Sequence, residues 1–330
     1  MQEIFDKMIE KAGELLENGT VNRVLGWKAG EFFYDPPPAV FGSKDELSDF
    51  VYSGFCGANL SKYLINETKK EGKIAVFLKP CDTYSFNQLV KEHRVDREKV
   101  YVLGVECRGK ADINKIRELG IKGIESIEEL PGDELLCRTI YGDKTVARRD
   151  ALLDRCTVCR KTHVVYDEMI TVDREIDDSW KGDRFDTVAK LETMTPDERF
   201  EFWRGELSKC IRCNACRNVC PACSCTNCVF DNPDSGVSQK AAYDSFEENM
   251  FHIIRAFHVA GRCTDCGECS RVCPQNIPLH LLNRKFIKDI DSFYGEFQAG
   301  ETADEPRTPL TNFTKEDVEP TVVSDKGGDN

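Results

Sequence analysis

The sequence lacks several features that mark whole classes of protein. No stretch approaches the ~18 consecutive apolar residues of a membrane-spanning helix. Lys and Arg do not cluster and the formal net charge is −13, which argues against binding nucleic acid through phosphate neutralisation. The chain starts with an acidic amphipathic pattern that has neither the basic nor the apolar region of a secretory leader. These absences predict a cytoplasmic protein whose partners are proteins or small molecules.

Cysteine, by contrast, is abundant, with seventeen residues in the chain. Seven fall within Cys210 to Cys228, four within Cys263 to Cys273, and six are spread over Cys56 to Cys159. Cytosolic reductants keep thiols reduced, and a chain of 330 residues can bury a core without disulfides. Metal ligation is therefore the favoured interpretation of these cysteines.

Two runs of the chain share one cysteine spacing. The pattern C-x2-C-x2-C-x3-C-P extends from Cys210 to Pro221 and recurs without a gap from Cys263 to Pro274. This spacing is typical of bacterial ferredoxins that hold two 4Fe-4S clusters. The alternative is a pair of zinc knuckles, but zinc needs only four thiolates per site. It gives no reason for a third evenly spaced cysteine or for the following proline.

The two runs predict two 4Fe-4S clusters with crossed ligation. In two-cluster ferredoxins the first three cysteines of a run hold one cluster, and the fourth holds the other. Because oxygen attacks exposed clusters, we expect an anaerobic setting. One predicted site consists of Cys210, Cys213, Cys216 and Cys273, and the other of Cys263, Cys266, Cys269 and Cys220.

Three more cysteines follow the first run directly, at Cys223, Cys225 and Cys228. Their spacing is suggestive of metal ligands, yet three thiolates do not complete a tetrahedral site. Either a further metal site takes its fourth ligand from a distant part of the chain, or these thiols are redox-active or structural.

Four cysteines in the first half of the chain predict a possible third 4Fe-4S cluster. Two of them follow the apolar runs IAVFL and VYVLGV, and two form a C-x2-C pair. Ligands in an α/β layer often lie at the carboxyl ends of strands. The alternative is that each is a small buried hydrophobe, which is our interpretation of Cys56 and Cys137. The four candidate ligands are Cys81, Cys107, Cys156 and Cys159.

The remaining pattern predicts an α/β N-terminal domain followed by a mainly helical, ferredoxin-like domain with two clusters. Residues 74–78 and 100–105 are continuous apolar runs typical of buried parallel strands, with helical segments after each. Residues 135–147 read as a hairpin around Gly142. The predicted divisions are an α/β domain at 1–170, a linker at 171–195, the dicluster domain at 196–295 and an extended tail at 296–330.

Helices are predicted on both sides of the first cysteine run. Thr195 and Glu198 form a capping box that starts a helix leading to Cys210. A long helix is predicted at residues 240–260, where compact ferredoxins have a short connection, and its apolar stripe is expected to face the core. We interpret His252 and His258 as ordinary residues of this helix, without a role on a metal.

The segments IAVFLKPCD, VYVLGVEC and CTVC, followed by the two cysteine runs, are similar to one family. They resemble the beta subunits of deazaflavin-coenzyme-reducing hydrogenases and formate dehydrogenases. The segment CPACSC also resembles the iron-sulfur subunits of sulfhydrogenases and anaerobic sulfite reductases. The resemblance covers about residues 70 to 290, and the order of its cysteines matches that of the possible third cluster.

The resemblance implies a subunit that relays electrons within an anaerobic oxidoreductase complex. Its partners would be a hydrogenase, a formate dehydrogenase or a heterodisulfide-reductase-like subunit, together with a second electron carrier. In the deazaflavin branch the first domain also holds FAD. Here the glycine-rich segment is represented by residues 53–64, and no G-x-G-x-x-G follows a strand.

Three functions are therefore open on sequence alone. The favoured one is a non-catalytic electron-transfer subunit, because nearly every residue with identifiable chemistry is a thiolate. The second is an FAD-bearing catalytic subunit that oxidises or reduces a soluble deazaflavin or nicotinamide cofactor. The third is an iron-sulfur sensor or structural protein, which gains little from two clusters placed side by side.

Overall fold

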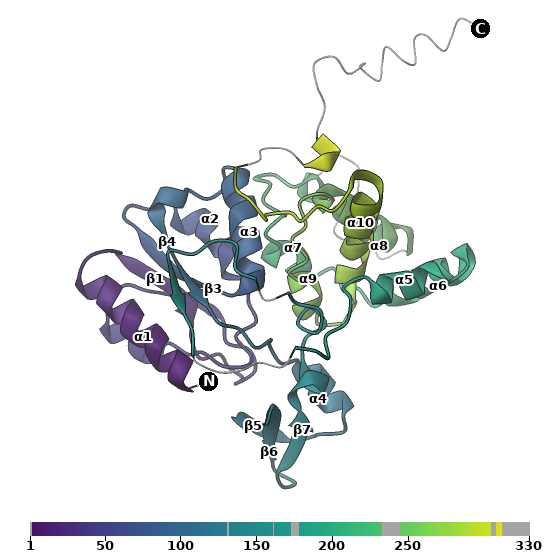
Figure 1. Cartoon of the computed structure of the whole chain (residues 1–330). Helices are drawn as coiled ribbons and strands as arrows, with labels where there is room; N and C mark the ends of the chain where they lie inside the picture. Colours follow the sequence, from purple (N-terminus) through teal and green to yellow (C-terminus); the bar gives the residue numbers. More distant parts are fainter. Residues whose placement is uncertain are drawn as a thin grey trace, which may run out of the picture.

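The N-terminal part of the chain is an α/β layer built on a five-stranded sheet (Figure 1). The computed structural model describes residues 2–130, 132–160, 162–172, 178–232, 245–304 and 308–311. The strand order is β2-β1-β3-β4-β8, with β2 antiparallel to β1 and the other pairs parallel. The strands are β1 (Arg23–Trp27), β2 (Pro38–Phe41), β3 (Ile74–Leu78), β4 (Val100–Val105) and β8 (Glu168–Ile170).

The two predicted parallel strands are confirmed as β3 and β4 at the centre of this sheet. Every residue of β3 is buried, as expected for a strand covered on both faces. Helix α1 (Gln2–Glu17) packs against β1 and β8, and α3 (Pro80–Lys91) packs against β3 and β4. The short helix α2 (Leu64–Glu67) precedes β3. The parallel topology therefore brings the carboxyl ends of β3 and β4, and the cysteines that follow them, to one edge.

A second, three-stranded antiparallel sheet extends from this layer (Figure 1). Its strands β6 (Glu134–Thr139) and β7 (Lys144–Ala147) form the predicted hairpin, in which Gly142 takes a φ of +104°. Strand β5 (Ile124–Leu130), which the sequence did not predict, pairs with β6. Helix α4 (Ile113–Glu118) starts after Asp112, whose side chain accepts a hydrogen bond from the Asn114 N–H.

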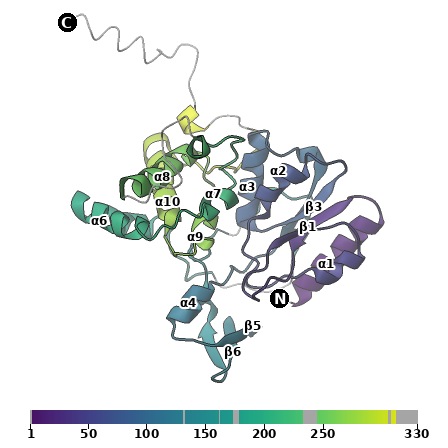
Figure 2. The ribbon, with the colours of Figure 1, turned by 180° about the vertical axis from the view of Figure 1, so that it is seen from behind.

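The described elements after β8 are helices and short helical turns, and most lie beside α3 on the far side from α1 (Figures 1 and 2). The predicted capping box is present, because Thr195 accepts from the Glu198 N–H and Glu198 accepts from the Thr195 N–H. The helices are α5 (Asp186–Glu192), α6 (Pro196–Leu207), α7 (Ala215–Val219), α8 (Ser245–Val259), α9 (Glu268–Arg271) and α10 (Leu279–Tyr294).

Two of the predicted divisions contain more contacts than a linker or a tail suggests. Helix α5 lies within the predicted linker 171–195, and its Val188 and Leu191 pack against Leu281 of α10. In the predicted tail, Glu301 O accepts a hydrogen bond from the Asn87 side chain of α3. Residues 312–330 lie outside the described part. No described helix combines the length and apolarity that a membrane span requires.

Candidate iron-sulfur sites

The two cysteine runs adopt the same backbone conformation. Arg212 and Asp265, each two residues after the first cysteine of its run, have φ values of +55° and +58°. Asn214 and Gly267, each directly after the second cysteine, have φ values of +62° and +68°. Left-handed backbone is uncommon outside glycine, so three such non-glycine residues in two short loops are unusual. The repeated spacing in the sequence is therefore a repeated loop geometry.

The first predicted set of ligands lines one cavity, and this set includes the cysteine from the second run. Cys273 lies close enough to Cys210 and Cys216 to raise the pKa of both thiols. The fourth cysteine of the second run therefore lies among the first three cysteines of the first run. The backbone N–H of Arg212 lies 3.3 Å from Cys210 Sγ, as a donor to sulfur. The cavity is lined by Cys210, Cys213, Cys216 and Cys273, together with Phe251, His252 and Ile277.

The second predicted set also comes together, with the reciprocal exchange. Burial raises the pKa of Cys263, Cys266 and Cys269, and in each case the nearby Cys220 raises it further. The Asn283 amide of α10 lies 3.7 Å from Cys269 Sγ and donates to it. The placement of Cys220 with the second run and Cys273 with the first is the arrangement that crossed ligation requires.

The third predicted set lies at the carboxyl edge of the five-stranded sheet. Its cavity has a volume of about 90 Å³ and is partly open to solvent. All four cysteines line it, and the Lys110 N–H donates to Cys156 Sγ at 3.3 Å. Thiolate ligands give a cluster negative charge, and the cationic lining suits such a group. The lining includes Cys81, Cys107, Cys156 and Cys159, and the cationic side chains Lys79, Lys110, Arg155, Arg160, Lys181, Arg184 and Arg284.

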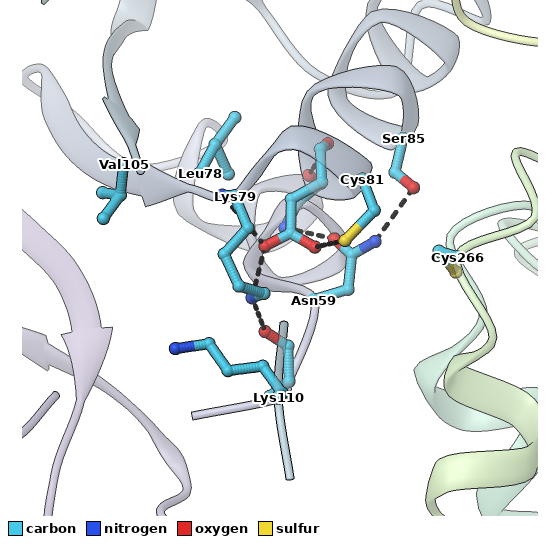
Figure 3. Close-up of polar contacts among 12 residues, drawn as sticks. Asn59, Leu78, Lys79, Cys81, Ser85, Val105, Lys110 and Cys266 are labelled. Atoms are coloured by element: carbon cyan, nitrogen blue, oxygen red, sulfur yellow. Dashed lines mark hydrogen bonds and ion pairs between the residues drawn. The ribbon is translucent and has the colours of Figure 1, made fainter. Parts of the chain in front are cut away.

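Two of these lysines are almost completely buried. Lys79 Nζ donates to Asp82 Oδ2 at 2.6 Å and to the Ala58 carbonyl at 2.8 Å (Figure 3). Burial lowers the pKa of Lys79, but Asp82 and Cys81 together raise it above its ordinary value. Lys110 Nζ donates to the Ser53 carbonyl at 3.0 Å. Burial lowers the pKa of Lys110, and the nearby Cys107 and Cys56 thiols oppose this effect only in part.

The junction between the third set and the second set is formed by Arg155. This side chain precedes Cys156, donates to Glu268 Oε1 at 2.7 Å and to the Gly57 carbonyl at 2.6 Å, and also contacts the Cys266 carbonyl. Thr264 and Asp265 of the second run line the third cavity. The loop around the second set is therefore also a wall of the third set.

The glycine-rich segment at residues 53–64 contributes to this junction. The Asn59 N–H donates to Glu268 Oε2 at 3.1 Å, and the Asn59 side chain donates to Ser85 Oγ (Figure 3). A Cβ atom on Gly57 would lie 2.8 Å from Cδ of Arg271. This segment therefore contacts the dicluster part of the chain, which is the part that contains the two cysteine runs.

The remaining cysteines have different surroundings. Cys223 hydrogen-bonds to Cys220, and this contact lowers the pKa of the Cys220 thiol to about 5. Arg255 contributes to the lowering, whereas burial opposes it. Cys225 is exposed, and Cys228 interacts with Arg217. The metal or redox role of Cys223, Cys225 and Cys228 therefore stays a prediction. Cys56 is buried beside Ser53, and Cys137 is buried in the core under the second sheet.

Across the described residues, no three His, Cys, Asp or Glu side chains converge closely enough to hold a single metal ion. A four-iron cluster is wider than one ion, so its cysteine ligands lie farther apart than the ligands of a zinc ion. This finding therefore concerns sites for a single ion and not the three sets of four cysteines.

Three polar residues near the cysteines were not predicted as site residues. Arg155, His252 and Arg255 are each buried beside a cysteine set. His252, interpreted from the sequence as an ordinary helix residue, lines the first cavity. For His252 and Arg255, the sequence offered one signal, which is their place on the inner face of the helix between the two cysteine runs. How deeply these side chains are buried depends on how that helix packs.

Comparison with known proteins relates the chain to redox subunits. A model of the 4Fe-4S dicluster domain matches residues 206–277. The F420-dependent formate dehydrogenase subunit beta of Methanocaldococcus jannaschii is 23% identical over 334 residues, covering 84% of this chain and 87% of that protein. The F420-dependent formate dehydrogenase 1 subunit beta of Methanococcus maripaludis is 24% identical over 341 residues, with coverages of 84% and 87%.

A solved chain of the F420-reducing NiFe hydrogenase complex from Methanosarcina barkeri matches with a TM-score of 0.36 and 15% identity. The match covers 48% of this chain and 62% of that one. The two relatives agree with the resemblance seen in the cysteine segments. The chain is thus homologous over most of its length to beta subunits of F420-dependent formate dehydrogenases, and it contains a 4Fe-4S dicluster domain.

Proposed function

We propose that the chain is the electron-transfer subunit of an oxidoreductase complex and holds three 4Fe-4S clusters. The observation that carries the proposal is the grouping of twelve cysteines into three sets, of which neighbouring sets share a boundary. Thr264 and Asp265 link the third set to the second, and Arg255 lies near both Cys216 and Cys269. Clusters with four cysteine ligands supply single-electron transfer and leave no coordination position for substrate.

The residues of the chain hold and orient these groups. Cys263, Cys266, Cys269 and Cys220 would hold the middle cluster, between the third set at the sheet edge and the first set under α8. Of the first set, Cys213 is exposed, and its neighbour Ile211 is also exposed at the surface. We infer that one redox partner docks near Ile211 and another near the open side of the third cavity.

The partners that the relatives suggest are formate dehydrogenase or hydrogenase subunits, with a heterodisulfide-reductase-like subunit as a further possibility from the cysteine pattern. The relatives are named for dependence on F420, and we propose that the complex exchanges electrons with a soluble carrier of this kind. The cytoplasm is the proposed location.

The test is turnover by the purified, cluster-loaded chain without other subunits. We expect it to accept and donate single electrons with artificial dyes, but to show no activity with hydrogen, formate, sulfite or a nicotinamide. Reduction of a deazaflavin or nicotinamide at the rate of the complete complex would contradict the proposal.

A second candidate is the FAD-bearing catalytic subunit. It is favoured by the cationic residues of the third cavity that lie beyond the cysteines, such as Lys181 and Arg184, because they could bind an anionic cofactor. The contacts of residues 53–64 with the dicluster part argue against it. Flavin absorbance released on denaturing the anaerobically purified chain would decide for this second function.

A further inference from the structure

Arg255 is a buried cation surrounded by cysteines. It lies on α8, and its side chain is 3% exposed. Its Nη1 lies 3.9 Å from Cys223 Sγ, and its Nε has no hydrogen-bond partner. Within the described ranges no carboxylate forms an ion pair with it, and its nearest charge partners are cysteines of both ferredoxin-type sets. These partners are Cys216 of the first set and Cys269 and Cys220 of the second set, together with Cys223, which belongs to neither set.

A buried charge without a counter-charge costs several kcal/mol, so an apolar side chain would be the less costly choice for packing alone. The neighbours Phe251 and Ile254 on the same helix fill the core in this way. The guanidinium at position 255 therefore requires negative charge, and the thiolates of two cluster sites are the anions that surround it.

His252 lies one turn earlier on the same helix, close to the first set. Its side chain is 2% exposed, and neither ring nitrogen has a hydrogen-bond partner among the described residues. The ring packs edge-on against Phe251, with 4.9 Å between centroids, and lines the cavity of the first set. An unsatisfied buried imidazole is costly unless its N–H finds an acceptor. The cysteine sulfur atoms of this cavity are available acceptors.

We propose that α8 sets the reduction potentials of the cluster pair, with Arg255 supplying positive charge and N–H donors to both sites and His252 supplying an N–H donor to the first. This inference rests on the proposed cluster function. Reduction adds one electron to a site, and a nearby cation or N–H donor stabilises the added negative charge. The same groups around a metal centre orient its ligands and tune it. The proposal gives a reason for the long helix between the two runs.

The experiment is a redox titration, followed by electron paramagnetic resonance, of full-length chains purified anaerobically. We expect Arg255→Met to make the potentials of both ferredoxin-type clusters more negative, by about tenfold in the reduction equilibrium or about 59 mV for one electron. Arg255→Lys should retain most of the wild-type potential. His252→Leu should shift the signal of the first set alone.

Matched control variants remove a guanidinium group and an imidazole group from exposed positions. Arg204→Met on α6 and His258→Leu on α8 should leave all potentials unchanged, since both residues are exposed. Arg255→Gln keeps a polar side chain without the charge, so it should behave like Arg255→Met even where the Met variant assembles poorly.

The outcomes separate this inference from the function on which it rests. If wild-type chain binds no iron-sulfur cluster, the proposed function fails. If Arg255→Met and Arg255→Gln keep full iron and wild-type potentials, the tuning role is refuted while the function stands. Loss of iron in Arg255→Met with unchanged potentials in Arg255→Gln would also refute it, because the positive charge would then not set the potentials.

Discussion

Arg155 and Glu268 form a buried ion pair across the boundary between the α/β layer and the dicluster part. Arg155 Nη1 lies 2.7 Å from Glu268 Oε1, and the two side chains are 5% and 2% exposed. Glu268 also binds Arg271, while Arg155 contacts the Cys266 carbonyl. One carboxylate therefore neutralises the buried guanidinium of Arg155 and the half-buried guanidinium of Arg271, at the place where the third and second cysteine sets meet.

Removing this carboxylate should destabilise the junction. Burial raises the pKa of Glu268, but Arg271 and Arg155 lower it to about 2, so the side chain is ionised at neutral pH. Glu268→Ala leaves the buried Arg155 and the half-buried Arg271 without this counter-charge, and we expect a loss of about 3–5 kcal/mol in the free energy of unfolding. Chemical denaturation of the cluster-loaded chain would measure it.

The control for this prediction is an exposed ion pair. Glu296 and Arg160 are 79% and 66% exposed, so Glu296→Ala should leave the denaturation midpoint nearly unchanged. Equal midpoints for the two variants would show that the buried pair does not hold the junction.

Crossed ligation makes a specific prediction for Cys220. Cys220 lies with Cys263, Cys266 and Cys269, although it belongs to the first run. Cys220→Ser should therefore reproduce the spectroscopic loss caused by Cys266→Ser and differ from that caused by Cys216→Ser. The iron content should fall from about twelve to about eight per chain. A Cys220→Ser spectrum that matches Cys216→Ser would mean that each run holds its own cluster.

The third cluster is tested by two buried cysteines of the first half. Cys156 lines the third cavity, whereas Cys137 lies in the core under the second sheet. Cys156→Ser should lower the iron content by about four atoms per chain, and Cys137→Ser should lower it by none. Full iron in purified Cys156→Ser chain would exclude a cluster with this ligand.

Local sequence signals predicted much of this fold. The apolar runs at 74–78 and 100–105 became the central strands, and the capping box at Thr195 started α6. These features depend on neighbouring residues, so they are legible in sequence. The outer strands β1, β2 and β8, of which β2 and β8 are the edges, were not predicted, because a short strand is specified by its pairing with residues far away in the chain.

The cysteine spacing indicated which thiols belong together, because a repeated loop places its cysteines by local geometry. The spacing contains no information about Arg155, His252 or Arg255. Each reaches a cysteine set through packing between distant elements, and burial of a charge is visible only when the neighbours are known. The polar surroundings of the sites therefore had to come from the structure.

The segment after α10 offers the last prediction, because one glycine fixes it against α3. Gly300 has a φ of +76°, and a Cβ atom at this position would lie 1.9 Å from the Tyr84 carbonyl oxygen. Both the left-handed backbone and the clash with backbone oppose a side chain there. Gln298 and Glu301, on either side, line the third cavity. Gly300→Ala should therefore lift residues 296–304 from α3 and open this cavity further to solvent.

Hydrogen exchange would measure the release of residues 296–304, and loss of colour in air would measure solvent access to the third cavity. We expect faster exchange at residues 296–304 and faster oxidative loss of the third cluster in Gly300→Ala, with the other two clusters decaying at the wild-type rate. Gly295→Ala is the matched control, since Gly295 has a φ of +93° but a Cβ atom at this position would meet nothing within 4 Å. This variant also places a side chain at a positive φ, but without the clash. If both variants expose the segment equally, backbone strain alone explains the effect, and the contact with Tyr84 is not what limits solvent access to the third cavity.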